Sequence, residues 1–394
     1  MAEQHGKALV PQIRFAGFTD PWEQRKLENY VVVSTTKNVD GKFGKEDVLS
    51  VSGEYGVVNQ ITFQGRSFAG ASVSNYGVVN TGDVVYTKSP LNSNPYGIIK
   101  VNKGIPGIVS TLYAIYHPRD NVYANFIQVY FEQHKRMNNY MHPLVNKGAK
   151  NDMKVTAENA LKGMVTFPSR EEQSVISAFF SRLDSLITLH QRKYDKLCVL
   201  KKSMLDKMFP KGGSLYPEIR FAGFTDPWEQ RKLGELSNEF KSGEFICADN
   251  VSVSGPYPVY GGNGLRGYTT TFNHEGLYTL IGRQGALCGN VNIADGKSYF
   301  TEHAVAVKAN HLNDTTFLYY LFGTLDLGQY SGQSAQPGLA VSNLVEVEAM
   351  VPDKAEQKKI SRVFKTVDSL ITLHQRKLEL LRNIKKSMLD KMFV

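Results

Sequence analysis

The chain has 394 residues, of which 42% are hydrophobic and 21% charged, a composition typical of globular proteins of two or three domains. It contains no run of about 18 apolar residues, which excludes a transmembrane helix. Three cysteines without metal-ligand or disulfide spacing, and an N-terminus without an apolar signal core, predict a cytoplasmic protein.

The formal net charge of +9 suggests a nucleic-acid partner, but the charge is unevenly distributed. Residues 28–165 include 14 basic and 10 acidic residues, whereas residues 234–350 include 5 basic and 11 acidic ones. Net charge alone therefore does not identify the partner.

Three sequence blocks occur twice in the chain, in the same order. They are IRFAGFTDPWEQRKL at Ile13–Leu27 and Ile219–Leu233, DSLITLHQRK at Asp184–Lys193 and Asp368–Lys377, and KKSMLDKMF at Lys201–Phe209 and Lys385–Phe393. The segments between the first and second blocks, about 28–165 and 234–350, share no obvious sequence with each other. This repeated order of constant, variable and constant segments predicts two copies of a whole domain-plus-helix unit.

The repeats divide the chain into six expected segments. In chain order these are an N-terminal lead (1–12), a first variable domain with the repeated opening block (13–167), a central helix (168–209), a linker (210–218), a second variable domain with its opening block (219–351) and a C-terminal helix (352–394). Proline and glycine in the linker are expected to end the central helix.

Segments 168–209 and 352–394 predict long amphipathic helices, because apolar residues recur at spacings of three and four between charged ones. Ser169 and Asp353, each followed by a glutamate three residues later, are capping signals at the helix starts. Each helix would span about 39 residues, or roughly 58 Å. Antiparallel pairing would cover both apolar stripes. The predicted seam residues are Ile176, Phe180, Leu183, Ile187, His190, Leu197, Met204, Ile360, Phe364, Val367, Ile371, His374, Leu381 and Met388.

Both variable segments are predicted to be β-rich, since aromatic and β-branched runs alternate with turns containing Gly and Asn. The expected fold class is therefore α+β. We predict two β-rich domains separated by two long antiparallel coiled-coil helices, related by a pseudo-twofold repeat.

Polar loops between the predicted strands carry side chains that can bind DNA. Arg pairs with guanine, and Asn or Gln with adenine, while Lys and Arg bind phosphates. Ordinary surface turns have a similar composition, because Gly, Asn and Ser suit turn backbones. The candidate DNA-binding residues are Gln64, Arg66, Lys88, Ser89, Asn92, Asn94 and Lys100 in the first segment, and Asn263, Arg266, Arg283, Gln284, Gln333, Ser334 and Gln336 in the second.

No catalytic constellation or metal-ligand cluster is found in the sequence. Gly262–Gly267 matches G-x-G-x-x-G, but a dinucleotide site requires a helix after the motif, and the residues that follow predict a strand. His190 and His374 occupy equivalent seam positions, where we expect packed, hydrogen-bonded histidines. A metal site or a pH switch is the alternative interpretation of this pair.

The layout resembles the DNA-specificity subunits of Type I restriction–modification systems. The resemblance covers nearly the whole chain from about Leu9. It rests on PEIRFAGFTDPWEQRKL at 217–233, on Pro-x-x-x-Glu-Gln at 168–173 and 352–357, and on the helix ending in KSMLDKMF. It implies that the two variable domains are target recognition domains, each reading one half of a split, asymmetric DNA sequence. The helices would set the length of the unread spacer.

The resemblance also implies a non-catalytic subunit that works through partners. These would be double-stranded DNA, two modification (methyltransferase) subunits and restriction (endonuclease and translocase) subunits, without a membrane. No cofactor would be bound by this chain, whereas S-adenosylmethionine, ATP and Mg would be bound by the partner subunits. A stand-alone DNA methyltransferase or nuclease remains an alternative, although the sequence shows no constellation for it. A coiled-coil protein scaffold is a second alternative, but it leaves the two unlike loop-rich domains unexplained.

Overall fold

The computed structural model describes residues 9–88, 94–147, 153–285, 287–331 and 338–394. The chain forms two compact units, the first comprising Met1–Leu189 and Lys377–Val394 and the second His190–Arg376. Two helices of 38 residues, α4 (Arg170–Lys207) and α7 (Lys354–Lys391), contribute to both units. The units divide these helices, so the sequence-based limits of the two variable domains stay predictions.

The first unit is built on a four-stranded antiparallel sheet in the order β2-β9-β6-β7, with further strand pairs β1–β12, β3–β4, β5–β8 and β10–β11. Its strands are β1 (Glu23–Lys26), β2 (Val31–Val33), β3 (Leu49–Ser52), β4 (Gly56–Asn59), β5 (Gly77–Val79), β6 (Val84–Thr87), β7 (Ile99–Val101), β8 (Gly107–Val109), β9 (Tyr113–Pro118), β10 (Asn146–Lys147), β11 (Met153–Lys154) and β12 (Met164–Phe167). Its shorter helices are α1 (Gln60–Gln64), α2 (Ala124–Glu132) and α3 (His134–Met141), with 3-10 turns η1 (Leu27–Asn29), η2 (Lys45–Asp47), η3 (His142–Leu144) and η4 (Asn159–Leu161).

The second unit has two four-stranded sheets, ordered β14-β21-β18-β19 and β16-β15-β20-β17, and the pair β13–β22. Its strands are β13 (Glu229–Lys232), β14 (Ser237–Ser242), β15 (Tyr257–Gly261), β16 (Gly264–Thr269), β17 (His274–Glu275), β18 (Tyr278–Gly282), β19 (Val291–Ala294), β20 (Lys297–Phe300), β21 (Ala304–Ala309) and β22 (Glu348–Val351). Its shorter helices are α5 (Thr315–Phe322) and α6 (Val341–Val345), with 3-10 turns η5 (Leu233–Leu236), η6 (Ala248–Asn250) and η7 (Leu327–Tyr330).

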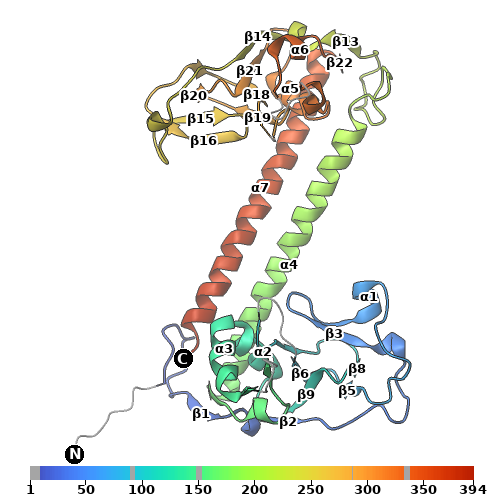
Figure 1. Ribbon diagram of the computed structural model, residues 1–394, viewed down its shortest axis with the longest axis vertical. Coiled ribbons are helices and arrows are strands. Elements are labelled where there is room, and N and C mark those ends of the chain that lie inside the picture. Colours follow the sequence, from blue (N-terminus) through green and yellow to red (C-terminus); the bar gives the residue numbers. More distant parts are fainter. Residues whose placement is uncertain (1–8, 89–93, 148–152, 286, 332–337) are drawn as a thin grey trace, which may run out of the picture. The chain divides into compact units, whose positions relative to one another are not determined.

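The two β-rich parts share one plan although their variable segments share no obvious sequence. In each, the chain passes from an inner strand of the antiparallel sheet, β9 or β21, directly into a helix, α2 or α5, that packs on that sheet (Figure 1). Both helices are apolar around most of their circumference and are largely buried, as a helix between a sheet and other elements should be. Equivalent tertiary positions are therefore filled by unlike sequences.

Each long helix begins beside a strand pair that closes the β-rich part. The opening repeat supplies β1 or β13, which pairs antiparallel with the strand that leads into the helix, β12 or β22. The registers correspond, since Glu23 lies opposite Phe167 and Glu229 opposite Val351. The repeated sequence thus joins the start of each domain to the base of its helix.

The two long helices run antiparallel within each unit. In the first unit Lys385 of α7 pairs with Asp184 of α4 at 2.7 Å, and in the second Lys201 of α4 pairs with Asp368 of α7 at 2.6 Å. The prediction of an α+β chain with two β-rich halves and two long packed helices is confirmed. Among the described residues, no helix combines the length and apolar character that crossing a membrane would need.

Burial along the predicted seam is uneven. Six of the fourteen predicted positions are buried and eight are half-buried. The buried ones are Ile176, Phe180, Leu183, Ile360, Phe364 and Val367. The half-buried ones are Ile187, His190, Leu197, Met204, Ile371, His374, Leu381 and Met388. The N-terminal part of each helix packs into a core of a β-rich part, and half-buried residues near the C-terminal ends, Met204, Leu381 and Met388, pack against these cores.

Candidate nucleic-acid interface

The repeated Pro-x-x-x-Glu-Gln motif holds each domain onto the start of a long helix. The glutamates are almost fully buried, with Glu172 and Glu356 each 1% exposed. Arg14 donates two hydrogen bonds of 2.7 Å to Glu172, and Arg220 donates bonds of 2.8 and 2.7 Å to Glu356. Planar guanidinium–carboxylate pairs of this kind fix orientation as well as distance.

The capping predicted for the helix starts is formed by Ser169 and Asp353 but not by the glutamates. The Ser169 hydroxyl and the Asp353 carboxylate do accept bonds from amides of the first turn. The glutamates, however, bind the arginines of the opening blocks, which lie 158 and 136 residues away in sequence. Because the Arg and the Glu recur together in both copies, the repeat itself was the signal that could have revealed the pairs.

The C-terminal end of each long helix completes an aromatic core. Phe393, just after α7, lies edge-on to Trp22 in the first unit, with ring centroids 6.0 Å apart. Phe209, just after α4, lies in the same relation to Trp228 in the second unit, again at 6.0 Å. Both Trp residues of the repeated Asp-Pro-Trp-Glu sequence are therefore core anchors rather than surface recognition groups.

His190 and His374 form a hydrogen-bonded pair in the second unit, with 2.8 Å between their Nδ1 atoms. A bond between two imidazole rings requires one ring to donate and the other to accept, so at least one ring is neutral. Within the described residues, no group of three or more His, Cys, Asp or Glu side chains could hold a metal ion. This geometry corresponds to the packed, hydrogen-bonded arrangement that the sequence predicts.

In the first unit, the candidate DNA-binding residues differ in accessibility. Gln64 ends α1 and is exposed, as is Arg66, whose guanidinium lies 4.6 Å from the ring centre of Phe68. Lys88 and Asn94 are half-buried, and burial lowers the pKa of Lys88. Ser89 and Asn92 lie outside the described residues.

Lys100 differs from the expectation of a phosphate contact. It lies on β7 and is only 7% exposed, because that strand is buried between β6 and α2. Burial lowers the pKa of Lys100, and Glu132 and Lys385 are close enough to influence it. The Lys100 side chain therefore lies in the interior of the unit, where a DNA phosphate could not reach it.

In the second unit, Asn263, Arg266 and Gln284 are exposed and line one cleft of about 580 Å³. Arg283 is half-buried and does not line it. Its Nε donates to the Leu339 carbonyl at 3.0 Å and its Nη1 to the Ser242 hydroxyl at 3.2 Å. Gln333, Ser334 and Gln336 lie outside the described residues.

The Gly262–Gly267 sequence forms the turn and the second strand of the β15–β16 hairpin. The helix N-terminus that a dinucleotide site needs is therefore missing after this motif. His303, which sequence reasoning did not select, joins the cleft because it immediately precedes β21. The strand pairing that brings it there has no local sequence signal.

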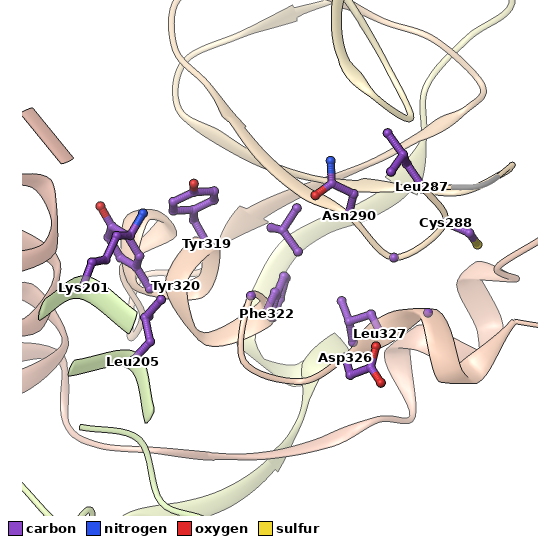
Figure 2. A pocket seen from close by; sticks show the side chains of 14 residues that line it. Lys201, Leu205, Leu287, Cys288, Asn290, Tyr319, Tyr320, Phe322, Asp326 and Leu327 are labelled. Carbon is purple, nitrogen blue, oxygen red and sulfur yellow. The ribbon is translucent and has the colours of Figure 1, made fainter. Parts of the chain in front are cut away.

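A second pocket of the same unit, of about 380 Å³, lies between α5, the end of α4 and the segment before β19. Lys201 and Tyr320 lie together on one side of it, with Asp326 and Leu327 on the other (Figure 2). Lys201 is paired with Asp368, and the Tyr320 hydroxyl donates to the same carboxylate at 2.8 Å. Burial and this carboxylate raise the pKa of Tyr320, so its hydroxyl is not poised for acid–base chemistry at neutral pH.

Comparison with known proteins connects this architecture to a family. Residues 225–383 match the family model described as the Type I restriction modification DNA specificity domain. Over this part, the chain is similar to the specificity subunits of Type I restriction–modification systems.

Two specificity subunits illustrate the range of sequence similarity. The EcoprrI subunit of Escherichia coli is 40% identical over 146 residues, which cover 36% of this chain and 36% of that protein. The putative MjaX subunit of Methanocaldococcus jannaschii is 22% identical over 333 residues, covering 78% of this chain and 77% of that protein. The stronger match is thus confined to about a third of each chain, whereas the weaker one extends over most of both.

The fold extends over the whole length of a solved relative. The crystal structure of the Type I restriction–modification S subunit from M. genitalium matches 98% of this chain and 99% of its own with a TM-score of 0.67. Only 14% of the residues are identical, so this likeness concerns the fold alone. Two β-rich halves with two long packed helices are compatible with very different sequences.

Proposed function

We propose that this chain selects the DNA sequence for a Type I restriction–modification complex, with each β-rich domain reading one half of a bipartite target. The proposal rests on one observation: the two β-rich domains share one plan but have unlike loop sequences. Both are attached through nearly identical stems, that is, the repeated opening block and the repeated helix blocks. Identical stems give both domains the same attachment to the long helices, through Arg14–Glu172 and Arg220–Glu356. Unlike loops give them different surfaces, so the two half-sites should differ and the target should be asymmetric.

The long helices suit the role of a spacer between the half-sites. A 38-residue α-helix is about 57 Å long. Half-sites on one face of B-DNA recur about every 34 Å, so this length is on the scale of the distance between them. Continuous helices with buried ion pairs at their bases would keep the spacing constant.

The helices also offer repeated apolar surface to partner subunits. Leu186 and Leu189 on α4 are 43% and 46% exposed, and the equivalent Leu370 and Leu373 on α7 are 39% and 44% exposed. Exposed leucines at helical spacing suit a partner helix. Their occurrence in both copies of DSLITLHQRK supports two modification subunits of one kind. These and the restriction subunits would bind S-adenosylmethionine, ATP and Mg, since the proposal places no catalytic step on this chain.

The proposal is tested by co-expression with the modification subunit, followed by single-molecule sequencing of the host DNA for methyladenine. The expected result is a split motif with two unlike half-sites around a fixed unread gap. Deleting seven residues, about two turns, from the matched middle of both helices should shorten the gap and leave both half-sites unchanged. An unchanged gap would contradict the spacer role.

The same co-expression system separates the other two interpretations. Methylation by the purified chain without any partner would instead indicate a stand-alone methyltransferase. A stable complex with the modification subunit that leaves host DNA unmethylated, and whose formation is insensitive to salt and DNA, would indicate a scaffold.

A further inference from the structure

The cleft of the second unit is lined mainly by backbone. It lies where the β15–β16 turn, the segment after β18 and the residue before β21 meet. Strands β15, β16 and β20 of this unit lie side by side (Figure 1). Half of the ten residues that line the cleft are glycines, so a ligand could approach the main chain closely. These glycines are Gly261, Gly262, Gly264, Gly285 and Gly338.

Two of the glycines are required by the turn itself. Gly264 has a φ of +90°, and a Cβ there would lie 3.0 Å from the Asn292 amide oxygen. At Gly262 a Cβ would lie 3.1 Å from the backbone oxygen of His303. Gly338 is different, since a Cβ there would meet none of the described residues within 4 Å. The turn is thus closely packed against Asn292 and His303, whereas the described residues leave space at Gly338.

The rim of the cleft is held in place by Arg283. Its two hydrogen bonds join the Leu339 carbonyl to Ser242 at the end of β14. The backbones of Gln284 and Gly338 also form an isolated β-bridge. The groups that face the cleft are therefore supported by a fixed frame, which favours specific recognition.

Several polar side chains at the cleft have unused hydrogen-bonding capacity. Within the described part of the chain, the side chains of Asn263, Arg266 and Gln284 are exposed and engage in no hydrogen bond or ion pair that the structure shows. His303 contributes less, because its Nδ1 is buried without a hydrogen-bond partner among the described residues and its Nε2 lies 3.3 Å from Glu302. A guanidinium and two amides therefore line this cleft, and these groups bind the edges of nucleobases.

The local charge favours a base edge over a phosphate. Residues 234–350 include 11 acidic and only 5 basic residues, and Glu302 lies beside His303 at the cleft. A phosphate would meet a negative field here, whereas the neutral edge of a base pair would not. Of the basic side chains in this segment, only Arg266 and Arg283 were expected to bind DNA, and Arg283 is used by the frame.

We propose that this cleft receives the major-groove edge of a G·C pair in one half-site, with Arg266 donating to guanine and Gln284 contacting the adjoining edge. This inference rests on the proposed function and adds the residues that determine specificity. The Arg266 side chain has two terminal donors, which match the O6 and N7 acceptors of guanine. The glycines let the base pair approach without a steric clash.

The test uses the complex with the modification subunit and compares methylation maps. Arg266→Ala should relax one G·C position of one half-site, lowering discrimination there by about 5- to 150-fold, the range for a bidentate contact. Gly338→Val should weaken recognition at the same half-site, because its side chain would occupy the space that the described residues leave there. The other half-site and the gap should stay unchanged. Lys297→Ala is the matched control, because it also removes one positive charge. Lys297 begins β20, whereas the other end of that strand, at Phe300, pairs with β15 beside the cleft.

Salt dependence distinguishes a base contact from a phosphate contact. The association constant for oligonucleotides is measured at several salt concentrations for the wild-type and Arg266→Ala complexes. The slope of its logarithm against the logarithm of salt concentration should be the same for both complexes, and only the ratio of specific to non-specific binding should fall in the variant. A slope reduced by about 0.9 would assign Arg266 to a phosphate and overturn the proposal. This measurement decides the matter even if the variant methylates no DNA.

The possible failures are distinguishable. An unchanged motif with Arg266→Ala would reject the cleft as the reading site while leaving the proposed function intact. A wild-type complex that assembles but methylates no DNA would reject the proposed function, and this inference with it.

Discussion

Removing one member of the buried Arg220–Glu356 pair should destabilise the second unit strongly. Arg220→Ala leaves the Glu356 carboxylate, 1% exposed, without the two hydrogen bonds that Arg220 supplies at 2.8 and 2.7 Å. Breaking a buried ion pair in this way costs about 3–5 kcal/mol, because an uncompensated charge stays in the interior. Asp226 and Asp353 are near enough to interact with Arg220, so the local field would also become more negative.

The size of the effect depends on which partner is removed. Glu356→Gln keeps a hydrogen-bond acceptor and removes the buried charge, so its cost should be smaller, about 1–2 kcal/mol. The double variant Arg220→Ala/Glu356→Ala should cost less than the sum of its single variants, since no charge is left unpaired. This non-additivity is the specific signature of a buried pair.

The two tryptophans of the chain allow each unit to be followed separately in urea. Trp22 and Trp228 are 2% and 1% exposed and lie in the first and second unit, respectively. In a Trp22→Phe background, fluorescence reports only on Trp228. With an m-value of about 2 kcal/mol/M, a loss of about 4 kcal/mol would lower the midpoint by about 2 M.

Arg231 provides the matched control in the same unit. It pairs with Glu229 at 2.6 Å, but both side chains are more than half exposed, and surface pairs contribute little. Arg231→Ala should therefore leave the midpoint unchanged within error. If Arg220→Ala shifts the Trp228 transition no more than Arg231→Ala does, the reasoning from burial is wrong.

Further predictions concern the ends of the long helices. Phe393→Ala should cost about 3–5 kcal/mol in the transition reported by Trp22, because Phe393 is 6% exposed within an aromatic cluster. A larger effect on Trp228 than on Trp22 would contradict its placement in the first core. Burial alone would lower the pKa of Lys385, but Glu132 and Asp184 outweigh it and raise the pKa above its usual value. The stabilisation from a raised lysine pKa is present at neutral pH and lost as pH rises through that pKa. Above pH ~10.5 the wild-type first unit should therefore lose stability faster than Lys385→Met, and parallel pH profiles would contradict this ion-pair role.

The sequence determined those features that depend on local or repeated signals. Apolar spacing and capping residues predicted helices at 168–209 and 352–394, and the helices span Arg170–Lys207 and Lys354–Lys391. Both signals act within a few residues, so they can be read without knowing the fold. The exact duplication of the opening and closing blocks likewise indicated two equivalent stems. The β-rich character of the variable segments followed from runs of aromatic and β-branched residues between turn residues.

Tertiary structure alone decided which polar residues face a common cleft. Lys100 was as plausible a DNA contact as Arg266 in the sequence, but Lys100 lies on a buried strand and Arg266 on an exposed hairpin. His303 joins Arg266 because β15 and β20 pair in parallel, and this pairing connects segments about 40 residues apart. Strand order and register set which side chains converge, and they arise from packing of the whole unit rather than from any local pattern.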